Sequence, residues 1–481
     1  MIIKLLQKEE GMALPIVMMI IAVVTLLGFT SVMLVNNQTV MGKRYENSET
    51  ALAIAEAGIN QCLWHLNQDS KFYTTPQGQD FLGKEHDFKN GKYIVEIDAP
   101  DSDRPTVKIK STGWLNGEET NKFALEVEVQ KRQFVQYAFL SELEETQKGE
   151  KVHWSTGDVI NGPVHTNGTL YISGRPVFND RVTYSKGIQV QGNPVYNNDR
   201  PEKVEPLEFP KNNDQLKELA QKGGNYFVGR TCILLDGNTI RIKNKNNPVQ
   251  TITDFGNGVI YVDGNTSKSG KWDEGLANVF VAGRLNGRLT IAAKNDIYIA
   301  GYDPTELKWS NAKKKPQGGV LYYDTTFDEQ GNVIHDGDDM LGLIANQNIY
   351  ILHGWFDDDF LDWLLEILFG SSPEDITIHA AVFALKGSFE YENYDAVSLL
   401  GGFINILKQL FGVIEKETVT LVGSICQYYR GAVGMERFFF DSGYDRKHYS
   451  YDRRMAYDSP PHFLEPENAG WEIVSWKRVA P

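Results

Sequence analysis

Carboxylates gather in one short stretch of the chain, where their oxygens could hold a divalent cation. The four candidate ligands are Asp324, Asp328, Asp336 and Asp338. Hard cations such as Ca²⁺ prefer carboxylate oxygens, so this stretch is a candidate Ca²⁺ site. Its spacing does not follow that of an EF-hand loop, and an acidic loop in solvent is the favoured interpretation. We therefore expect no cofactor.

Four other residues on glycine-bounded strands could do acid–base chemistry: Asp158, His165, His379 and Gln427. A β-helix that gathers such groups could be a polysaccharide lyase or a glycosidase. Asp and Asn at strand ends more often bond their own backbone, and a histidine beside Thr-Asn-Gly is typical of a turn. No Ser-His-Asp spacing, nucleophile elbow or phosphate-binding loop stands out. We predict that the protein is not an enzyme.

The chain has three cysteines, Cys62, Cys232 and Cys426, which are far apart in sequence and form no C-x-x-C motif. An odd, unclustered set does not indicate a disulfide framework. Each cysteine is therefore expected to be a small buried residue.

The charge balance argues against binding to phosphates or to anionic lipid. With 48 basic and 63 acidic residues among 481, the net charge is −15. Such a surface repels nucleic acid. Arginines and tyrosines alternate near residues 444–457, but nearby aspartates nearly cancel their charge. We interpret this stretch as part of a tail that packs along the domain.

From about Phe134 onward the chain consists of short strands with Val or Ile at alternate positions, each bounded by Gly, Asn or Asp. Clear examples are 258–264, 278–283, 295–301, 348–352 and 375–380. Similar rungs in succession predict a parallel β-helix or solenoid, in which each coil covers the next. The alternative is a β-sandwich with Greek-key connections.

A single long apolar run, from Met12 to about Val35, precedes everything else. It carries no charge and is long enough to span a bilayer as a helix. It includes Pro15 and Gly28, which membrane helices tolerate better than soluble ones. The run is too long for a signal peptide, and no small-x-small cleavage site follows it.

The helical pattern continues beyond the apolar run. Apolar residues recur at steps of three and four from Leu52 to Leu66, and 67–70 reads as the helix end. Three stretches then alternate apolar with polar residues, at 92–98, 106–112 and 122–130. They predict a small antiparallel sheet with one face buried against the helix.

Two segments near the N-terminus resemble a known family. Gly11-Met12-Ala13-Leu14 after a charged leader is similar to a type IV prepilin signal, and Ser48 to Ile59 resembles the Ala-rich helix of PilX-like minor pilins. The resemblance implies cleavage between Gly11 and Met12 by a prepilin peptidase, followed by N-methylation of Met12. It also implies assembly through one helix, with these residues: Leu14, Pro15, Ile16, Leu27, Ala55, Glu56 and Ala57.

One position departs from that family. Pilins usually carry a glutamate at the fifth mature position, and here that position is Ile16. An unpaired ammonium in an apolar filament core is costly. The chain therefore resembles the minor, tip-located pseudopilins more than a repeating subunit. A plain signal-anchor helix, neither cut nor polymerised, is the alternative.

The remainder also resembles a bacterial domain of unknown function that is commonly fused behind PilX-like N-termini. The similar stretches are 157–168, 341–346, 379–389, 423–434 and 443–454, with Pro460 to Phe463 and Trp476 following. This resemblance supplies a context but no chemistry.

Two apolar, helical segments interrupt the strands at 355–369 and 403–414. Both are too short to span a membrane. We expect them to pack on each other or on the body, or else to form a partner patch. The candidate patch residues are Trp355, Phe360, Trp363, Phe403, Leu410 and Phe411.

The predicted organisation has five parts. They are a leader (1–11), a transmembrane pilin-like helix (12–67), a small sheet (68–133), a β-rich solenoid-like domain (134–440) and a tail packing on that body (441–481). The predicted fold is α+β followed by mainly β.

We expect a minor, tip or low-abundance subunit of a type IV pilus or related secretion filament. Its expected location is the inner membrane, with the N-terminus inside and the bulk outside, and later the cell surface. Expected partners are other pilins, the assembly machinery, the prepilin peptidase and the bilayer, without specific nucleic-acid binding. A membrane-anchored adhesin that never polymerises is the second hypothesis, and an anchored carbohydrate-active β-helix is the third.

Overall fold

The computed structural model describes most of the chain in two compact units. The described residues are 13–69, 71–100, 106–223, 225–245, 247–267, 270–306, 314–352, 375–392, 418–437, 440–444 and 446–481. Unit 1 combines the N-terminal part through Gln130 with Trp471–Pro481, and unit 2 is formed by Lys131–Gly470. Unit 2 is thus an insertion, in sequence, between two strands of unit 1.

The first element is one uninterrupted helix, α1 (Ala13–Gln68), of 56 residues. The apolar run and the amphipathic segment that follows it are both good helix material, and no glycine–proline break separates them. The helix ends at Gln68, within the stretch 67–70 predicted to end it. The prediction of a long N-terminal helix followed by a mainly β chain is confirmed.

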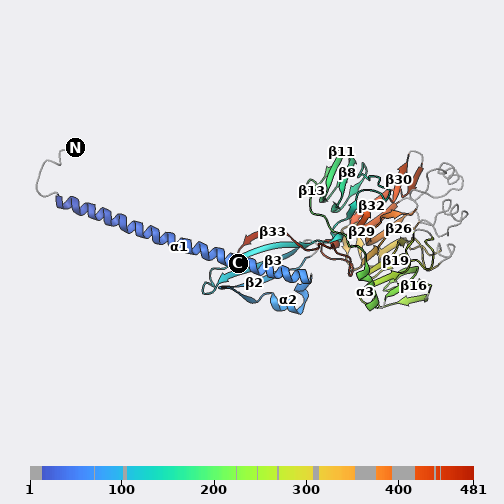
Figure 1. Cartoon of the computed structure of the whole chain (residues 1–481), viewed down its shortest axis with the longest axis horizontal. Helices are drawn as coiled ribbons and strands as arrows, with labels where there is room; N and C mark the ends of the chain where they lie inside the picture. Colours follow the sequence, from blue (N-terminus) through green and yellow to red (C-terminus); the bar gives the residue numbers. More distant parts are fainter. Residues whose placement is uncertain are drawn as a thin grey trace. The chain divides into compact units, whose positions relative to one another are not determined.

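Unit 1 packs a five-stranded sheet on the second half of α1 (Figure 1). The strand order is β1-β2-β3-β4-β33, and the first four strands pair antiparallel. Two short helices, η2 (Phe72–Thr74) and α2 (Pro76–Phe81), connect α1 to the sheet. The strands are β1 (Glu85–Phe88), β2 (Gly91–Asp98), β3 (Val107–Leu115), β4 (Phe123–Lys131) and β33 (Trp471–Val479). The predicted antiparallel sheet is present.

Small residues bring the helix and the sheet close together. Ala51 and Ala55 are fully buried against β3. A Cβ atom built on Gly113 would lie 2.5 Å from both the carbonyl oxygen of Ala51 and the backbone nitrogen of Ala55. Gly58 of the helix is equally crowded, because a Cβ atom built on it would lie 2.4 Å from the hydroxyl oxygen of Ser111. The Ala-rich segment therefore serves this close contact within unit 1.

The last strand corrects one prediction. We expected residues 441–481 to form a tail on the β-rich body, and Phe463 and Leu464 do belong to a core cluster of unit 2. From Trp471 onward, however, the chain joins unit 1 as β33, beside β4. The indole nitrogen of Trp471 donates to the carbonyl of Leu66 at 3.0 Å, and Arg478 pairs with Glu49 at 3.1 Å. The alternation in this short segment gave no indication of its partner strand.

In its described residues unit 2 is mainly β, with one α-helix, α3 (Asp214–Gly223), and two short 3₁₀ helices, η3 (Phe134–Gln136) and η4 (Arg453–Ala456). The strands in its first part are β5 (Phe139–Leu143), β6 (Val159–Ile160), β7 (Val164–Thr166), β8 (Thr169–Gly174), β9 (Val177–Phe178), β10 (Val182–Tyr184), β11 (Gly187–Gly192), β12 (Val195–Tyr196) and β13 (Glu202–Lys203).

The middle part contains β14 (Tyr226–Val228), β15 (Thr231–Gly237), β16 (Thr239–Asn244), β17 (Asn247–Ile252), β18 (Val259–Asp263), β19 (Val279–Leu285), β20 (Arg288–Ala293), β21 (Ile297–Ile299), β22 (Gly319–Tyr322), β23 (Thr326–Phe327) and β24 (Val333–His335). The last part contains β25 (Met340–Ala345), β26 (Ile349–Ile351), β27 (Ile376–Ala384), β28 (Phe389–Tyr391), β29 (Thr418–Tyr429), β30 (Gly434–Arg437), β31 (Phe440–Gly443) and β32 (Arg446–Tyr451).

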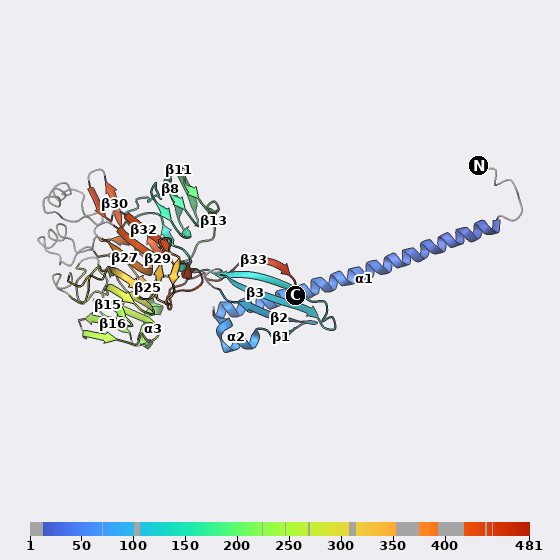
Figure 2. The same cartoon turned by 180° about the vertical axis from the view of Figure 1, so that it is seen from behind.

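Most strands of unit 2 pair in parallel (Figure 2). The longest ladder runs β14-β18-β20-β25-β27-β29-β5-β7-β10-β13. β5, the first strand of the unit, therefore lies in the middle of the ladder. The strands that follow β5 in sequence, β7, β10 and β13, lie on one side of it. The later strands, from β14 to β29, lie on the other side.

Residues of like kind stack along this ladder. One row of partners is Ile260, Ile291, Leu343, Val382, Ile425, Phe139, Val164 and Val182. All of them are buried in one core cluster. The neighbouring row, from Tyr261 to Leu140, is buried on the other face under Phe134, Leu216 and Phe463. Burial on both faces explains why β25 is apolar throughout and does not alternate.

The first part of unit 2 repeats at a fixed interval. Asn179 donates to Asn161 and Asn197 donates to Asn179, each at 2.6 Å and each across 18 residues. The same interval separates the partners of β6 with β9, β9 with β12, and β8 with β11. Stacked amides satisfy one another at the same corner of successive turns of the chain.

The contact between the helix and the sheet can be tested at Gly113, where a side chain would meet the helix backbone. Gly113→Ala should weaken unit 1 by about 1–3 kcal/mol, because the new methyl group meets helix backbone that cannot move aside. Hydrogen exchange of the β3 amides in the full chain would measure the change. Gly42→Ala is the matched control, because no atom lies within 4 Å of a Cβ there. Unchanged protection of β3 in Gly113→Ala would contradict the packing described.

Candidate functional site

The first half of α1 is apolar and uncovered. Every residue from 13 to 46 is exposed, including the predicted assembly residues Leu14, Pro15, Ile16 and Leu27. The exposed fractions of Leu14 and Leu27 are 72% and 59%. An apolar surface of this length is not stable in water and marks contact with lipid or with other apolar helices.

The hydroxyl groups of the apolar run bond within the helix. The hydroxyls of Thr30 and Ser31 both donate to the carbonyl of Leu27, at 2.9 and 2.8 Å, and Thr25 donates to Ile21. A hydroxyl that bonds the preceding turn needs no water. The segment therefore suits an apolar medium in its polar groups as well as in its composition.

The second half of α1 is used differently. Ala55 is fully buried in the core of unit 1, Ala57 is half-buried and Glu56 is exposed. Ala55 is therefore a contact to the unit's own sheet and is not available to a neighbouring chain. Within the described residues, α1 is the one helix long and apolar enough to cross a membrane.

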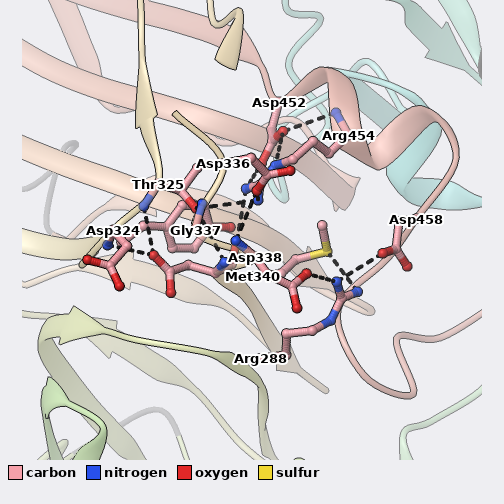
Figure 3. A network of polar contacts seen from close by, with 12 residues as sticks. Arg288, Asp324, Thr325, Asp336, Gly337, Asp338, Met340, Asp452, Arg454 and Asp458 are labelled. Carbon is pink, nitrogen blue, oxygen red and sulfur yellow. Dashed lines mark hydrogen bonds and ion pairs between the residues drawn. The ribbon is translucent and has the colours of Figure 1, made fainter. Parts of the chain in front are cut away.

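The acidic loop lies beside a buried arginine (Figure 3). The guanidinium of Arg454 donates to both carboxylate oxygens of Asp452, at 3.1 and 2.8 Å, and to Asp336 at 2.8 Å. It also donates to the carbonyl of Asp339 at 2.9 Å. Arg454 is 4% exposed and Asp452 is fully buried. The bidentate pair with Asp452 holds the guanidinium in place within the segment after β32. The bonds to Asp336 and to the carbonyl of Asp339 fix this segment to the loop before β25.

The four predicted Ca²⁺ ligands have separate partners. Asp336 pairs with Arg454, and Asp338 pairs with Arg288 at 2.8 Å. Asp324 accepts from the amide of Asn286 at 2.9 Å. Asp328 accepts from the side chain and backbone of Asn332, each at 2.8 Å. In the part of the chain that the structure describes, no three His, Cys, Asp or Glu residues come together as a metal site.

The residues considered for acid–base chemistry fall into different places. His165 is buried between Thr183 and Asn167, at 2.9 Å from each, and burial lowers its pKa to about 4. The ring of His379 lies beside that of Tyr322, with centroids 5.3 Å apart and the planes tilted by 55°. Asp158 and Gln427, in contrast, line the same cavity. Asp158 accepts from the backbone of Ser155 at 2.7 Å, as a turn residue does.

The three cysteines, Cys62, Cys232 and Cys426, are free and buried. Burial raises the pKa of each thiol to about 12. A thiol that stays protonated is a poor nucleophile and a poor metal ligand. They contribute to the cores of their units.

Several predicted residues lie outside the described part of the chain. These are the cleavage and methylation residues Gly11 and Met12, together with the candidate partner patch: Trp355, Phe360, Trp363, Phe403, Leu410 and Phe411. Their roles stay predictions.

Sequence reasoning missed two arginines and one ladder. Arg454 and Arg430 each make a buried ion pair, with Asp452 and Glu144 respectively. A short-range signal existed for the first, because Asp452 and Arg454 are two residues apart. The asparagine ladder also had a signal, the recurrence of Asn after Val-Ile, Val-Phe and Val-Tyr at 161, 179 and 197. Nothing in the sequence connects Arg430 to Glu144.

Comparison with known proteins relates the chain to one family model and to solved structures. The model of a domain of unknown function, DUF4900, matches residues 106–187, from β3 to the start of β11. No curated protein matches the chain. Among solved structures, the chain is similar to the crystal structure of the competence-associated pilin ComZ from Thermus thermophilus, at 13% identity and a TM-score of 0.31. That match covers 90% of this chain and 97% of ComZ.

The buried pair generates a stability prediction. Arg454→Ala should destabilise unit 2 by about 3–5 kcal/mol, because it leaves the carboxylate of Asp452 buried without a counter-charge. Denaturant unfolding of the full chain would measure it. Arg453→Ala, at the exposed neighbouring position, is the control and should change stability little. A loss below about 1 kcal/mol in Arg454→Ala would contradict the role assigned to the pair.

His165 generates a pH prediction. An unfolded histidine titrates near pH 6.5. With a folded pKa of about 4, the neutral form of His165 stabilises the protein above pH 6.5. This stability should be lost as the pH falls from 6.5 to about 4, by at most about 3 kcal/mol. His165→Gln should reduce the slope of the unfolding free energy with pH over this window, whereas His335→Gln, at an exposed position, should leave the slope unchanged. An unchanged slope in His165→Gln would count against the assignment.

Proposed function

We propose that this chain is a membrane-anchored, pilin-like subunit of a type IV pilus or a related secretion filament. The observation that carries the proposal is the division of α1. Its first half is exposed from residue 13 to residue 46 and apolar as far as about Val35, while its second half, from Ala51 to Leu66, is packed in unit 1. One rigid helix can thus hold a folded unit outside a membrane and extend an apolar segment into the bilayer or a bundle of like helices.

The N-terminal sequence supports processing. Gly11-Met12 follows a leader with Lys4 and Lys8, as in prepilins. In the proposed sequence of events, the peptidase cuts after Gly11, and Met12 becomes the methylated N-terminus. Lys4 and Lys8 favour a cytoplasmic start, with units 1 and 2 on the far side of the inner membrane. Neighbouring pilins, the assembly machinery and the bilayer are the proposed partners.

Ile16 supports a minor position in the filament. A processed chain beginning at Met12 would have no carboxylate at its fifth residue to neutralise its own ammonium group. Such a chain fits the tip, or sparse positions, better than the repeating core. The inserted unit 2, with 340 residues between Lys131 and Gly470, would crowd adjacent copies in a shaft. We propose a PilX-like minor or tip subunit.

We further infer that unit 2 is a β-solenoid. The support comes from the parallel ladders, the rows of like residues and the spacing of 18 residues between stacked asparagines. A β-sandwich with Greek-key connections would pair its strands antiparallel, so the parallel ladders disfavour that alternative. The antiparallel pairs are local: β15 with β16, β16 with β17, β23 with β24, and β30 with β31.

A surface adhesin that is anchored but never polymerises is the second candidate. The same exposed helix would anchor it, and the absence of a carboxylate at position 16 favours it over a shaft pilin. The two candidates differ in processing, because an anchor keeps its N-terminal leader. We retain the proposal that the protein is not an enzyme.

Processing gives the test. In its native host, the mature protein should begin at Met12 and carry an N-terminal methyl group, as measured by mass spectrometry of the N-terminal peptide. Gly11→Arg should block cleavage, because the peptidase site must accommodate the residue before the scissile bond. Lys8→Arg, which preserves the leader charge, is the control and should be processed normally. An intact Met1 terminus in purified filaments would refute the pilin proposal, and an intact terminus in the membrane fraction alone would favour the adhesin.

A further inference from the structure

Unit 2 contains a cavity of about 620 Å³ that the proposed filament role does not use. It opens between the turn before β6 and the segment after β29. Cavities of this size hold sugar-sized ligands. Its walls combine apolar rings, such as Phe139 and Phe389, with charged side chains.

The charge of the lining is opposite to that of the protein. Its Lys and Arg residues are Lys148, Lys151, Arg430 and Lys447, against two lining carboxylates, Glu150 and Asp158, and a third, Glu144, that pairs with Arg430 behind the wall. The whole chain has a net charge of −15. A local excess of cations in a concave surface attracts anions.

Arg430 is held rigidly in the wall. Its guanidinium lies 3.7 Å from the ring centroid of Trp154 and 4.3 Å from that of Phe139, and it pairs with the buried carboxylate of Glu144. Arg430 is 9% exposed. An arginine stacked in this way keeps its fork of donors in one orientation.

Donors remain available in this wall. Nη1 of Arg430 is used by Glu144, whereas its Nε and Nη2 have no hydrogen-bond partner among the described residues. Gln427 is 1% exposed, and its Oε1 accepts from the backbone of Phe389 at 2.9 Å and of Gly431 at 3.2 Å. Its Nε2 and the hydroxyl of Tyr449 have no partner within the described part of the chain either. Donors that line a cavity and have no protein partner can bond water or the acceptor groups of a ligand.

The geometry points to a carboxylate-bearing sugar as the ligand of this cavity. The free donors of Arg430 suit a carboxylate. The carboxylates of Glu150 and Asp158 can accept from sugar hydroxyls, and the aromatic wall can cover an apolar sugar face. Inorganic phosphate would satisfy the arginine but would leave most of the cavity unfilled. We therefore propose that unit 2 binds uronic acid residues, either as free sugars or as units of an acidic polysaccharide.

The test is calorimetric titration of the full chain in detergent micelles with D-galacturonate, D-glucuronate and a short oligogalacturonide. Binding of a uronate, with at least tenfold weaker binding of glucose, acetate and inorganic phosphate, is the expected result. Tighter binding of the oligomer than of the monosaccharide would identify a polymer as the source. Equal binding of phosphate and uronate, or binding of none of the sugars, would overturn the proposal.

Variants locate the site. Tyr449→Phe should weaken uronate binding about three- to tenfold, the equivalent of one hydrogen bond. Arg430→Lys should weaken it at least tenfold, but it also alters a buried ion pair, so its fold must be checked by circular dichroism. Lys151→Glu should weaken binding, whereas Lys186→Glu, an equal charge change at an exposed position outside the cavity, should not. Unchanged affinity in both Tyr449→Phe and Lys151→Glu would place the ligand elsewhere and refute the assignment.

This outcome is separate from the proposed filament role. Binding is measured on the isolated chain, whereas processing at Gly11 is measured in the host. Failure of either experiment leaves the other inference standing.

Discussion

An apolar helix cannot remain uncovered in water, and this constraint governs unit 1. From Ala13 to Gln68 the backbone is one helix, so all of its internal peptide groups are satisfied without solvent. The sheet of unit 1 covers only the part from Ala51 to Leu66. The remaining apolar surface must be covered by lipid or by other helices. Anchoring in a bilayer and assembly with other helices would each cover this apolar surface.

The close contact in unit 1 depends on small residues that face each other. Ala51 and Ala55 of the helix meet Gly113 of the sheet, and Gly58 meets Ser111. A larger residue on either side would separate the two elements and expose the core from Ile54 to Leu125. The strand β33 completes the sheet, so the beginning and the end of the described chain are fixed in one unit. Unit 2 can therefore be large without changing the helix on which anchoring depends.

The sequence predicted elements better than it predicted partners. The 3.6-residue period after the apolar run and the alternation in three stretches correctly gave α1 and the strands β2, β3 and β4, because these signals are local. The pairing of β33 with β4 and the place of β5 between β29 and β7 were not predicted, since they depend on contacts across hundreds of residues. The candidate Ca²⁺ ligands were chosen by residue type alone. In the structure, Asp336 and Asp338 instead form ion pairs with Arg454 and Arg288, which are distant from them in sequence.

We expect α1 to pass from lipid or other apolar helices into water between the apolar run and Lys43-Arg44. Single cysteines at Leu27, Met33 and Tyr45, each of which is exposed on the helix, can be probed in isolated membranes with a water-soluble maleimide. The native cysteines are buried, with pKa values raised to about 12, and should add little background. Our prediction is rapid labelling at position 45 and protection at positions 27 and 33. Equal labelling at all three positions would contradict it.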